Sequence, residues 1–232
     1  MNNRNIQHAF PVRPVGGGIN KIILGHGNNN YTSKSLYDKI FFLENVFLAW
    51  HKFAKSKHSR RDVMIYERNL EENLFNLQAE LKNQNYCHGK YQPFIVYDPK
   101  KRQIHKTTVK DRIVHQAVVN IIEPIFEKRF IFNSFSCRIG KGIHGASYRL
   151  RDFLSKASQN NTKTIYALKC DVSKFFDSID HNILLDFICC QIKDEKTIKL
   201  LRHIIGSFSK APNKGLPLGN LTSQLFANIY LK

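Results

Sequence analysis

Three carboxylates lie close together in the last third of the chain, at Asp171, Asp177 and Asp180. Residues 164–168, just before the first of them, are rich in β-branched and apolar side chains, which predicts a strand. A strand that ends in a carboxylate holds it on a rigid platform, where it can bind a metal ion or act as a catalytic acid. Asp180 precedes a predicted helix and is better explained as its N-cap, and Asp177 as a residue that shapes the turn.

The amino-acid composition, and its charge in particular, indicates what kind of partner the protein would bind. The 232 residues include 36 Lys and Arg against 18 Asp and Glu, a net charge of +18, and the pI is near 9.8. A hydrophobic content of 42% predicts a folded globular protein with a sizeable core. The charge excess favours a polyanionic partner, because Lys and Arg side chains would neutralise its phosphates and release their counterions. A basic surface that binds nothing is the alternative.

The sequence gives no support for several classes of protein. There is no apolar run of the roughly 20 residues that a membrane span needs, and residues 1–10 lack the apolar core of a secretory signal. The five cysteines form no C-x-x-C pair, which predicts reduced thiols in a cytoplasmic protein. We expect Cys189 and Cys190 to lie in the core. No Ser or Cys has a His at a recognisable triad spacing, so hydrolase chemistry is not indicated.

The first third of the chain reads as an arm and two helices. Residues 1–30 are rich in Gly and Asn and predict a flexible arm. Apolar side chains at helical spacing predict helices over 36–53 and 62–83, the second with Asp62 as its N-cap. The basic break between them, residues 55–61, could touch nucleic acid but is more simply explained as a solvated loop.

A β-hairpin is predicted over residues 91–105, with its turn at 98–101. An Asp-Pro pair begins the turn, and apolar and polar residues alternate on either side. Four cations concentrate on this finger: Lys100, Lys101, Arg102 and Lys106. A cationic tip of this kind can hold a triphosphate or a backbone phosphate. A merely solvated turn is the alternative.

The remaining segments are mainly helical. A helix is predicted over 111–126, where Pro124 should end or kink it and His115 should be a hydrogen-bonded core residue. The loop 135–146 runs into a helix that ends at about Ser158. Two more helices are expected at 194–207 and 221–232, separated by a turn rich in Gly and Pro. Since Ile229 and Leu231 in the last helix still require packing partners, we expect the chain to be a fragment.

Taken together, three segments resemble the reverse transcriptase family. The cationic hairpin, with residues 109–130 and 134–146 after it, resembles the fingers of group II intron and retroelement enzymes. Residues 169–181, KCDVSKFFDSIDH, resemble the palm motif that supplies the first catalytic aspartate. Residues 215–231, GLPLGNLTSQLFANIYL, resemble the next motif, which helps to form the nucleotide pocket and the template track.

One departure from the pattern concerns the third motif. Intron enzymes usually have Gln-Gly and then Ser-Pro, whereas this chain has Leu218-Gly219 and Ser223-Gln224. The pattern is similar to reverse transcriptases of diversity-generating retroelements, which copy a template with errors at adenines. Gln can hydrogen-bond near the base pair, whereas Leu218 can only fill space, so we expect weaker discrimination between correct and incorrect base pairs.

The resemblance implies a catalytic site. Asp171 and the backbone carbonyl of Val172 would be ligands of two Mg²⁺ ions. The family's other two acids lie in a Tyr-x-Asp-Asp hairpin after the third motif, and this sequence ends before it, so we expect the fragment to be inactive alone. Phe176 would exclude a ribose 2′-hydroxyl. The implied nucleotide-binding residues are Lys101, Arg102, Ser173, Lys174, Phe176, Leu218 and Gly219.

The implied fold is α/β (α+β), a right-hand polymerase with an antiparallel palm sheet. Residues 31–160 would form helical fingers and 161–232 a partial palm, with the rest of the palm and the thumb missing. The implied partners are an RNA template, a DNA or RNA primer, deoxynucleoside triphosphates and a small basic accessory protein, with no membrane. An intron-type or abortive-infection enzyme, and a non-catalytic RNA-binding protein of the same fold, remain alternatives.

Overall fold

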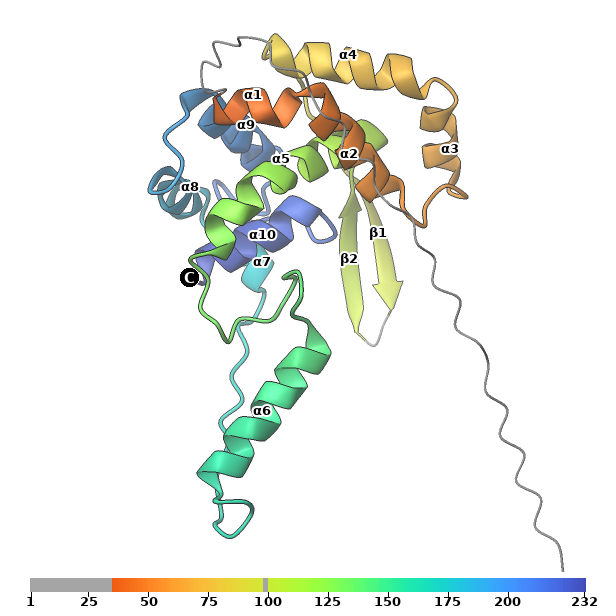
Figure 1. Cartoon of the computed structure of the whole chain (residues 1–232). Coiled ribbons are helices and arrows are strands. Elements are labelled where there is room, and N and C mark those ends of the chain that lie inside the picture. The colour runs from red at the N-terminus through yellow and green to blue at the C-terminus, as the bar shows by residue number, and fades with distance from the viewer. Residues whose placement is uncertain (1–34, 98–99) are drawn as a thin grey trace, which may run out of the picture. The chain divides into compact units, whose positions relative to one another are not determined.

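The computed structural model of the chain describes residues 35–97 and 100–232 (Figure 1). The predicted arm at 1–30 and the Asp98-Pro99 pair of the hairpin turn lie outside the described residues. The described part is mixed, with helices and one small antiparallel sheet. Its elements are α1 (Leu36–Phe41), α2 (Leu43–Ala54), α3 (Arg61–Glu67), α4 (Leu70–Lys82), β1 (Gln92–Tyr97), β2 (Lys101–Lys106), α5 (Val109–Glu127), α6 (Ile143–Ala157), α7 (Phe175–Ser178), α8 (His181–Cys189), α9 (Glu195–Gly206) and α10 (Leu221–Tyr230).

Helix α5 lies at the centre of the core and packs against α1, α2 and α10. Ile113, Val118 and Ile122 on its apolar face are completely buried. The helix begins in a capping box, in which the Thr108 side chain accepts from the Asp111 backbone N–H and the Asp111 carboxylate accepts from the Thr108 N–H. Pro124 does not end α5, which continues to Glu127. Proline lacks a backbone N–H, but the hydrogen bond that is lost belongs to the last turns of the helix, where packing against the core maintains it.

Both predicted N-terminal helices are interrupted. Phe42 has extended dihedral angles (φ −57°, ψ 135°) and separates α1 from α2. The segment 62–83 is divided into α3 and α4, and the N-cap of α3 is Arg60. The prediction that Asp62 caps this helix was therefore wrong. Its carboxylate instead pairs with Lys106 and Arg112, and these tertiary contacts outweigh the local capping preference.

The predicted hairpin is confirmed. Strands β1 and β2 pair antiparallel, with a register that runs from Gln92 opposite Lys106 to Tyr97 opposite Lys101. Most of its side chains are exposed, so the hairpin projects from the core as a finger. Helix α6 is also little buried, and none of its residues lies in the core. Two cation–π contacts involve its Arg149, with the rings of Phe132 and Phe153.

The strand predicted at 164–168 does not form. These residues have no regular secondary structure, and Tyr166 and Leu168 are 96% and 91% exposed. A strand needs a hydrogen-bonded neighbour, and across residues 35–97 and 100–232 the hairpin is the only sheet. Asp171 therefore lies on an extended, exposed stretch that leads into α7.

Helices α8 and α9 begin at aspartates. Asp180 accepts hydrogen bonds from the backbone N–H groups of Asn182 and Ile183, which confirms it as an N-cap. The five cysteines are free thiols. Cys189 is only half-buried and Cys190 is exposed, so the prediction that both belong to the core was wrong; the buried face of α8 carries Leu184, Leu185 and Ile188 instead. None of the described helices combines the length and apolar character needed to cross a bilayer.

Candidate functional site

The base of the hairpin contacts the turn before α10. The backbone N–H of His105 donates to the carbonyl of Leu218 at 3.0 Å. Gly219 follows with φ +106°, and a Cβ at this position would lie 2.7 Å from Cγ2 of Ile104. Only a residue without a side chain fits this contact, because the backbone is left-handed and the hairpin is so close. Two of the predicted motifs therefore form one surface.

The same turn contacts the aspartate-bearing motif. The backbone N–H of Leu216 donates to the Phe176 carbonyl at 2.8 Å, and that of Gly215 donates to the Ile179 carbonyl at 2.8 Å. The His181 side chain reaches back and donates from Nε2 to the Gly215 carbonyl at 2.7 Å. These bonds place Phe176 and α7 beside the turn, so the turn joins all three motifs.

A groove of about 330 Å³ lies between the hairpin and the helical core. The hairpin supplies Phe94, Ile104 and Lys106 to its walls, and the turn before α10 supplies Gly219 and Asn220. Further lining residues come from α2, α5, α10 and the connection between α2 and α3, and they include Lys52, Lys57, Arg60, Arg112, His115 and Gln224.

Positive charge dominates this groove. Lys106 lies 2.9 Å from the Asp62 carboxylate, which Arg112 also contacts. Burial would raise the pKa of Asp62, but hydrogen bonds from the two cations lower it to about 2. The pKa of Lys57 is lowered, first by burial and then by the charges of Arg60 and Arg112. One carboxylate thus faces several cations, and a phosphate in the groove would relieve their repulsion.

The sequence did not single out Lys57 and Arg60. They belong to the basic break 55–61, which was explained most simply as a solvated loop. The structure brings them to the groove because Asp62, just after them, pairs with cations of β2 and α5. The density of Lys and Arg in the break was the available signal.

The other predicted nucleotide-binding residues have varied surroundings. Lys101 and Arg102 lie exposed on β2, near the end of the hairpin away from the core. Ser173 is exposed, and Lys174 has a left-handed backbone (φ 50°) at the N-terminus of α7. Phe176 is half-buried and packs against the core. The structure joins Phe176, Leu218 and Gly219 through the turn. Gly219 lines the groove together with Lys106 of the hairpin, whereas Lys101 and Arg102 do not line it.

The described residues do not complete a metal site. Asp171 and Val172 are both exposed. Across residues 35–97 and 100–232, no group of three His, Cys, Asp or Glu side chains could hold a metal ion. Mg²⁺ requires near-octahedral oxygen ligation, usually with one or two carboxylates and several waters or phosphates. Asp171 is a suitable ligand by chemistry, but it belongs to no such group among the described residues.

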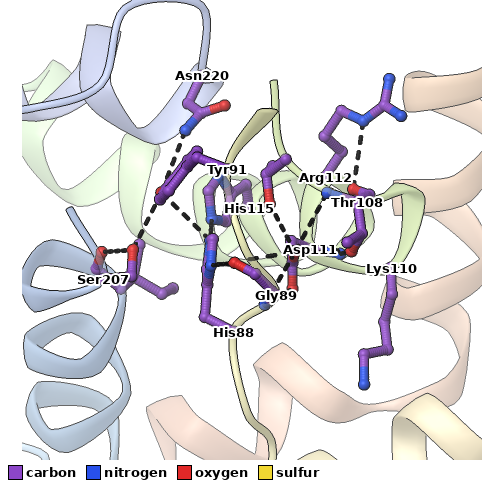
Figure 2. Close-up of polar contacts among 12 residues, drawn as sticks. His88, Gly89, Tyr91, Thr108, Lys110, Asp111, Arg112, His115, Ser207 and Asn220 are labelled. Carbon is purple, nitrogen blue, oxygen red and sulfur yellow. Dashed lines mark hydrogen bonds and ion pairs between the residues drawn. The ribbon is translucent and has the colours of Figure 1, made fainter. Parts of the chain in front are cut away.

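A buried carboxylate anchors the base of the hairpin (Figure 2). Asp111 is fully buried and accepts from the hydroxyls of Thr107 (2.5 Å), Thr108 (2.6 Å) and Tyr86 (2.7 Å), and from the Gly89 N–H (3.2 Å). Burial alone would raise the pKa of Asp111, but these side-chain hydrogen bonds hold it below its ordinary value. The carboxylate therefore fixes both chain segments that flank the hairpin.

Two histidines extend this network, and their protons can be assigned from their partners. Nδ1 of His88 lies 2.7 Å from the Gly89 carbonyl, which can only accept, so it carries the proton. Nε2 of His88 then accepts from Nε2 of His115 at 3.2 Å, and Nδ1 of His115 accepts from the Thr222 hydroxyl at 3.3 Å. Burial, with the nearby His88, lowers the pKa of His115 to about 3. The prediction of a hydrogen-bonded core histidine is confirmed.

A second branch reaches Asn220, at the start of α10. The Ser207 hydroxyl donates to the Ile204 carbonyl at 2.6 Å, so its oxygen accepts from the Tyr91 hydroxyl at 3.0 Å. The Asn220 amide donates to the Tyr91 oxygen at 3.4 Å. Tyr91 directly precedes β1, and Asn220 lines the groove, so the network ties the hairpin to the groove wall.

A protein-family model identifies this arrangement. The model of the reverse transcriptase (RNA-dependent DNA polymerase) family matches residues 92–232, which include the hairpin, α5, α7 and the turn before α10. The chain belongs to the reverse transcriptase family. The resemblance inferred from the three motifs is thereby confirmed at the level of the family.

Curated relatives of this chain include an intron-encoded protein. Protein YkfC of Escherichia coli is 27% identical over 168 residues, which cover 67% of this chain and 44% of that protein. The group II intron-encoded protein LtrA of Lactococcus lactis is 30% identical over 142 residues, 57% of this chain and 22% of that one. The chain thus spans less than half the length of the curated relatives described above.

Solved structures agree with the fold. The chain superposes on a chain of a partial Cas6-RT-Cas1–Cas2 complex with a TM-score of 0.56 at 19% sequence identity. The match covers 91% of this chain and 36% of the other. At this identity the likeness concerns the fold, and it extends over helices on the N-terminal side of the family match.

We expect Asp111→Asn to lower the free energy of unfolding by about 2–3 kcal/mol at pH 7, because an amide would face donors such as the Gly89 N–H. The pKa of Asp111 is lower in the folded chain, so its contribution is complete above the unfolded value of about 4, begins to decline below it and is lost as the pH falls through the lower folded value. Urea unfolding of both proteins at pH 7 and pH 3.5 should show the difference shrinking. The exposed Asp152→Asn is the control; equal stability of Asp111→Asn and wild type at pH 7 would contradict this role.

Gly219→Ala should separate the base of the hairpin from the turn, because the new Cβ would overlap Ile104 and the alanine would have to adopt a left-handed backbone conformation. Amide hydrogen exchange reports this directly: the His105 N–H, which donates to Leu218, should lose protection. Gly206→Ala is the matched control, since a Cβ there meets nothing within 4 Å. Unchanged exchange at His105 in Gly219→Ala would show that the contact does not hold the hairpin.

Proposed function

We propose that this protein is an RNA-directed DNA polymerase that copies an RNA template into DNA. The observation that carries the proposal is the turn before α10, which bonds to the hairpin through Leu218 and to the Asp171 motif through Leu216. It thereby joins the family's three motifs, two of which, the hairpin and the turn before α10, line the cationic groove. Residues 31–160 would serve as the fingers and 161–232 as part of the palm of a right-hand polymerase.

Metal binding is assigned to Asp171 and the Val172 carbonyl. Two Mg²⁺ ions, when bound, would activate the primer hydroxyl and neutralise the leaving pyrophosphate. Asp171 is exposed and on an extended stretch, so its carboxylate is accessible to ions. Because no group of three candidate ligands forms among the described residues, further ligands would have to come from elsewhere in the active enzyme.

The triphosphate would be held by the hairpin and by the start of α7. Arg102 offers a bidentate donor pair and Lys101 a point charge, both exposed and on adjacent positions of β2. Ser173 and Lys174 lie just after Asp171 and can add donors to the same phosphates. Gly219 permits close approach of the nucleotide to the backbone.

The groove is proposed to hold the sugar–phosphate backbone of the template. Lys57 and Arg60 line it together with Lys106 and Arg112, and Asp62 neutralises only part of their charge. Backbone contacts of this kind are independent of sequence, as a polymerase requires. A primer and a small basic accessory protein are further proposed partners, and the cytoplasm is the proposed location.

Two types of reverse transcriptase fit these observations. The likeness to LtrA and to the nuclear intron maturase 1 of Arabidopsis thaliana (29% identical over 92 residues) favours an intron-type enzyme. Leu218, where intron enzymes usually have Gln, favours the error-prone enzyme of a diversity-generating retroelement. Sequencing the DNA products distinguishes them, because only the second should carry frequent substitutions opposite template adenines.

In the gene product that carries this chain, Asp171→Ala should abolish primer extension on an RNA template while leaving RNA affinity unchanged. The carboxylate would be a metal ligand, and its loss removes the chemistry without removing cations from the groove. Asp177→Ala, in the same motif, is the matched control and should retain extension. Near-normal synthesis by Asp171→Ala would refute the assignment, and absence of synthesis by the wild type would favour a non-catalytic RNA-binding protein.

Phe176→Ala should increase incorporation of ribonucleotides relative to deoxynucleotides, because the ring is proposed to contact the sugar where a 2′-hydroxyl would sit. Steady-state kcat/KM for the two sugars measures this selectivity. Phe175→Ala, which removes the neighbouring ring 5.8 Å away, is the control for general loss of packing. If both variants keep the wild-type preference, Phe176 is an ordinary packing residue.

A further inference from the structure

Helix α8 has a second apolar face, which the core does not cover. Its inner face packs into the core, but Ile183 and Phe187 are 44% and 41% exposed, and the thiol of Cys190 is exposed as well. Because these residues follow one another at intervals of four and three positions, they form one stripe along the outer side of the helix. Nothing in the proposed polymerase function uses this α8 stripe.

A cavity of about 370 Å³ opens beside the C-terminal half of the α8 stripe. Phe126 and Ile229, which are almost completely buried, form its floor, and Phe187 and Cys190 also line it. The Phe187 ring makes an edge contact with Tyr230, at 6.0 Å between ring centroids, which holds it in place. The stripe is thus a fixed ridge next to an apolar hole, and helices pack by fitting such ridges into such holes.

The surface around the stripe carries little of the positive charge of the chain. Although the net charge is +18, α8 and α10 contain no Lys or Arg, and Asp186 is the one acid in them. Among the described residues, the cavity has one cation in its lining, Lys232. A nucleic acid would therefore find few cations to neutralise its phosphates here. Two copies of so basic a chain would repel each other least at a surface of this kind.

The two ends of α8 carry opposite charges. Asp180 caps the N-terminus and begins the stripe, three positions before Ile183. Lys193 lies just beyond the C-terminus, where its Nζ donates to the Cys189 carbonyl at 2.8 Å. Across residues 35–97 and 100–232, neither Asp180 nor Lys193 has a partner of opposite charge within 4 Å. Each can therefore pair with a charge supplied by another molecule.

We propose that a second copy of this chain docks on the α8 stripe, with its own α8 antiparallel to the first. About a two-fold axis beside Phe187, Ile183 of the second copy lies opposite Cys190 and enters the cavity. The same axis brings Lys193 of the second copy to Asp180, because positions 183 and 190, and positions 180 and 193, are centred on the same point of the helix. The antiparallel arrangement also places the positive end of each helix dipole beside the negative end of the other.

Self-complementarity favours a second copy over an unrelated protein. The stripe supplies both halves of each contact, a ridge and a hole, an acid and a cation, which is what an interface with two-fold symmetry requires. An unrelated partner would have to match all of these features separately. The α8 cavity shares no lining residue with the groove beside the hairpin, so the inference does not depend on polymerase activity.

Sedimentation equilibrium of the 232-residue chain tests the proposal. The wild type should dimerise reversibly. Phe187→Glu should raise the Kd of the dimer on the order of a hundredfold, because the two-fold axis counts the change twice and each copy would bury an unpaired carboxylate. Phe75→Glu is the matched control and should dimerise as the wild type does. Phe75 is 47% exposed on α4 and makes the same kind of edge contact, with Phe47 at 6.3 Å.

A disulfide bond tests the register of the two helices. Within one chain, positions 183 and 190 are two helical turns apart, about 10.5 Å, and cysteines with Cα atoms more than about 7 Å apart cannot be bridged. Oxidation of Ile183→Cys with diamide should therefore link the introduced thiol to Cys190 of the second copy, as mass spectrometry of the linked peptides would show. The wild type, oxidised in parallel, controls for links among the native cysteines.

Three results would overturn the inference. They are a wild type that stays monomeric, equal dimerisation of Phe187→Glu and Phe75→Glu, and a link from the introduced thiol to a cysteine other than Cys190. A monomeric wild type would assign the α8 stripe to a different partner. Should Phe187→Glu fail to fold, Ile183→Cys still decides the question, because the side chain that it replaces is half-exposed.

Discussion

The hydrogen bonds to the buried carboxylate of Asp111 are the interaction on which this structure depends. Its donors come from both sides of the hairpin, with Tyr86 and Gly89 before the finger and Thr107 and Thr108 after it. The same residue begins α5, around which the core packs. A finger that is exposed along most of its length thus gains a fixed base, and a charged group is tolerated in the core because its oxygens are saturated with donors.

The polar network around this carboxylate also lies between the groove beside the hairpin and a second cavity, of about 330 Å³, beside α9. His115 and Asn220 line the groove beside the hairpin, whereas Tyr86 and His203 line the cavity beside α9. His88 links the two sides, since its N–H donates to His203 and its ring accepts from His115. The carbonyls of Gly89 and Ile204, which can only accept, fix the proton positions of His88 and Ser207. The network therefore forms a wall that the groove and the cavity beside α9 share.

Sequence patterns predicted the features that depend on near neighbours. The hairpin, the cap at Asp180 and the buried His115 follow from turn residues, capping preference and helical periodicity, and the structure confirms them. The features that failed depend on distant partners. Asp62 is a good N-cap by residue type, but its carboxylate forms ion pairs with two cations, one on β2 and one on α5. Residues 164–168 have strand composition, but they lack a neighbouring strand among the described residues. For the same reason the sequence could nominate Asp171 as a ligand but not show the rest of its site. The density of Lys and Arg at 55–61 marked that segment as basic, but it could not show that Lys57 and Arg60 line a groove.

The contact between Gly219 and Ile104 has a consequence for how this protein can vary. The two positions are far apart in the chain, yet the space for a side chain at one is filled by a methyl group of the other. A larger residue at 219 would be accommodated only by a smaller one at 104 together with a backbone that leaves the left-handed region. Sequence drift on the finger and sequence drift in the turn are therefore not independent. Substitutions along the exposed length of the finger meet no such packing constraint, whereas its base and the turn must evolve as a pair.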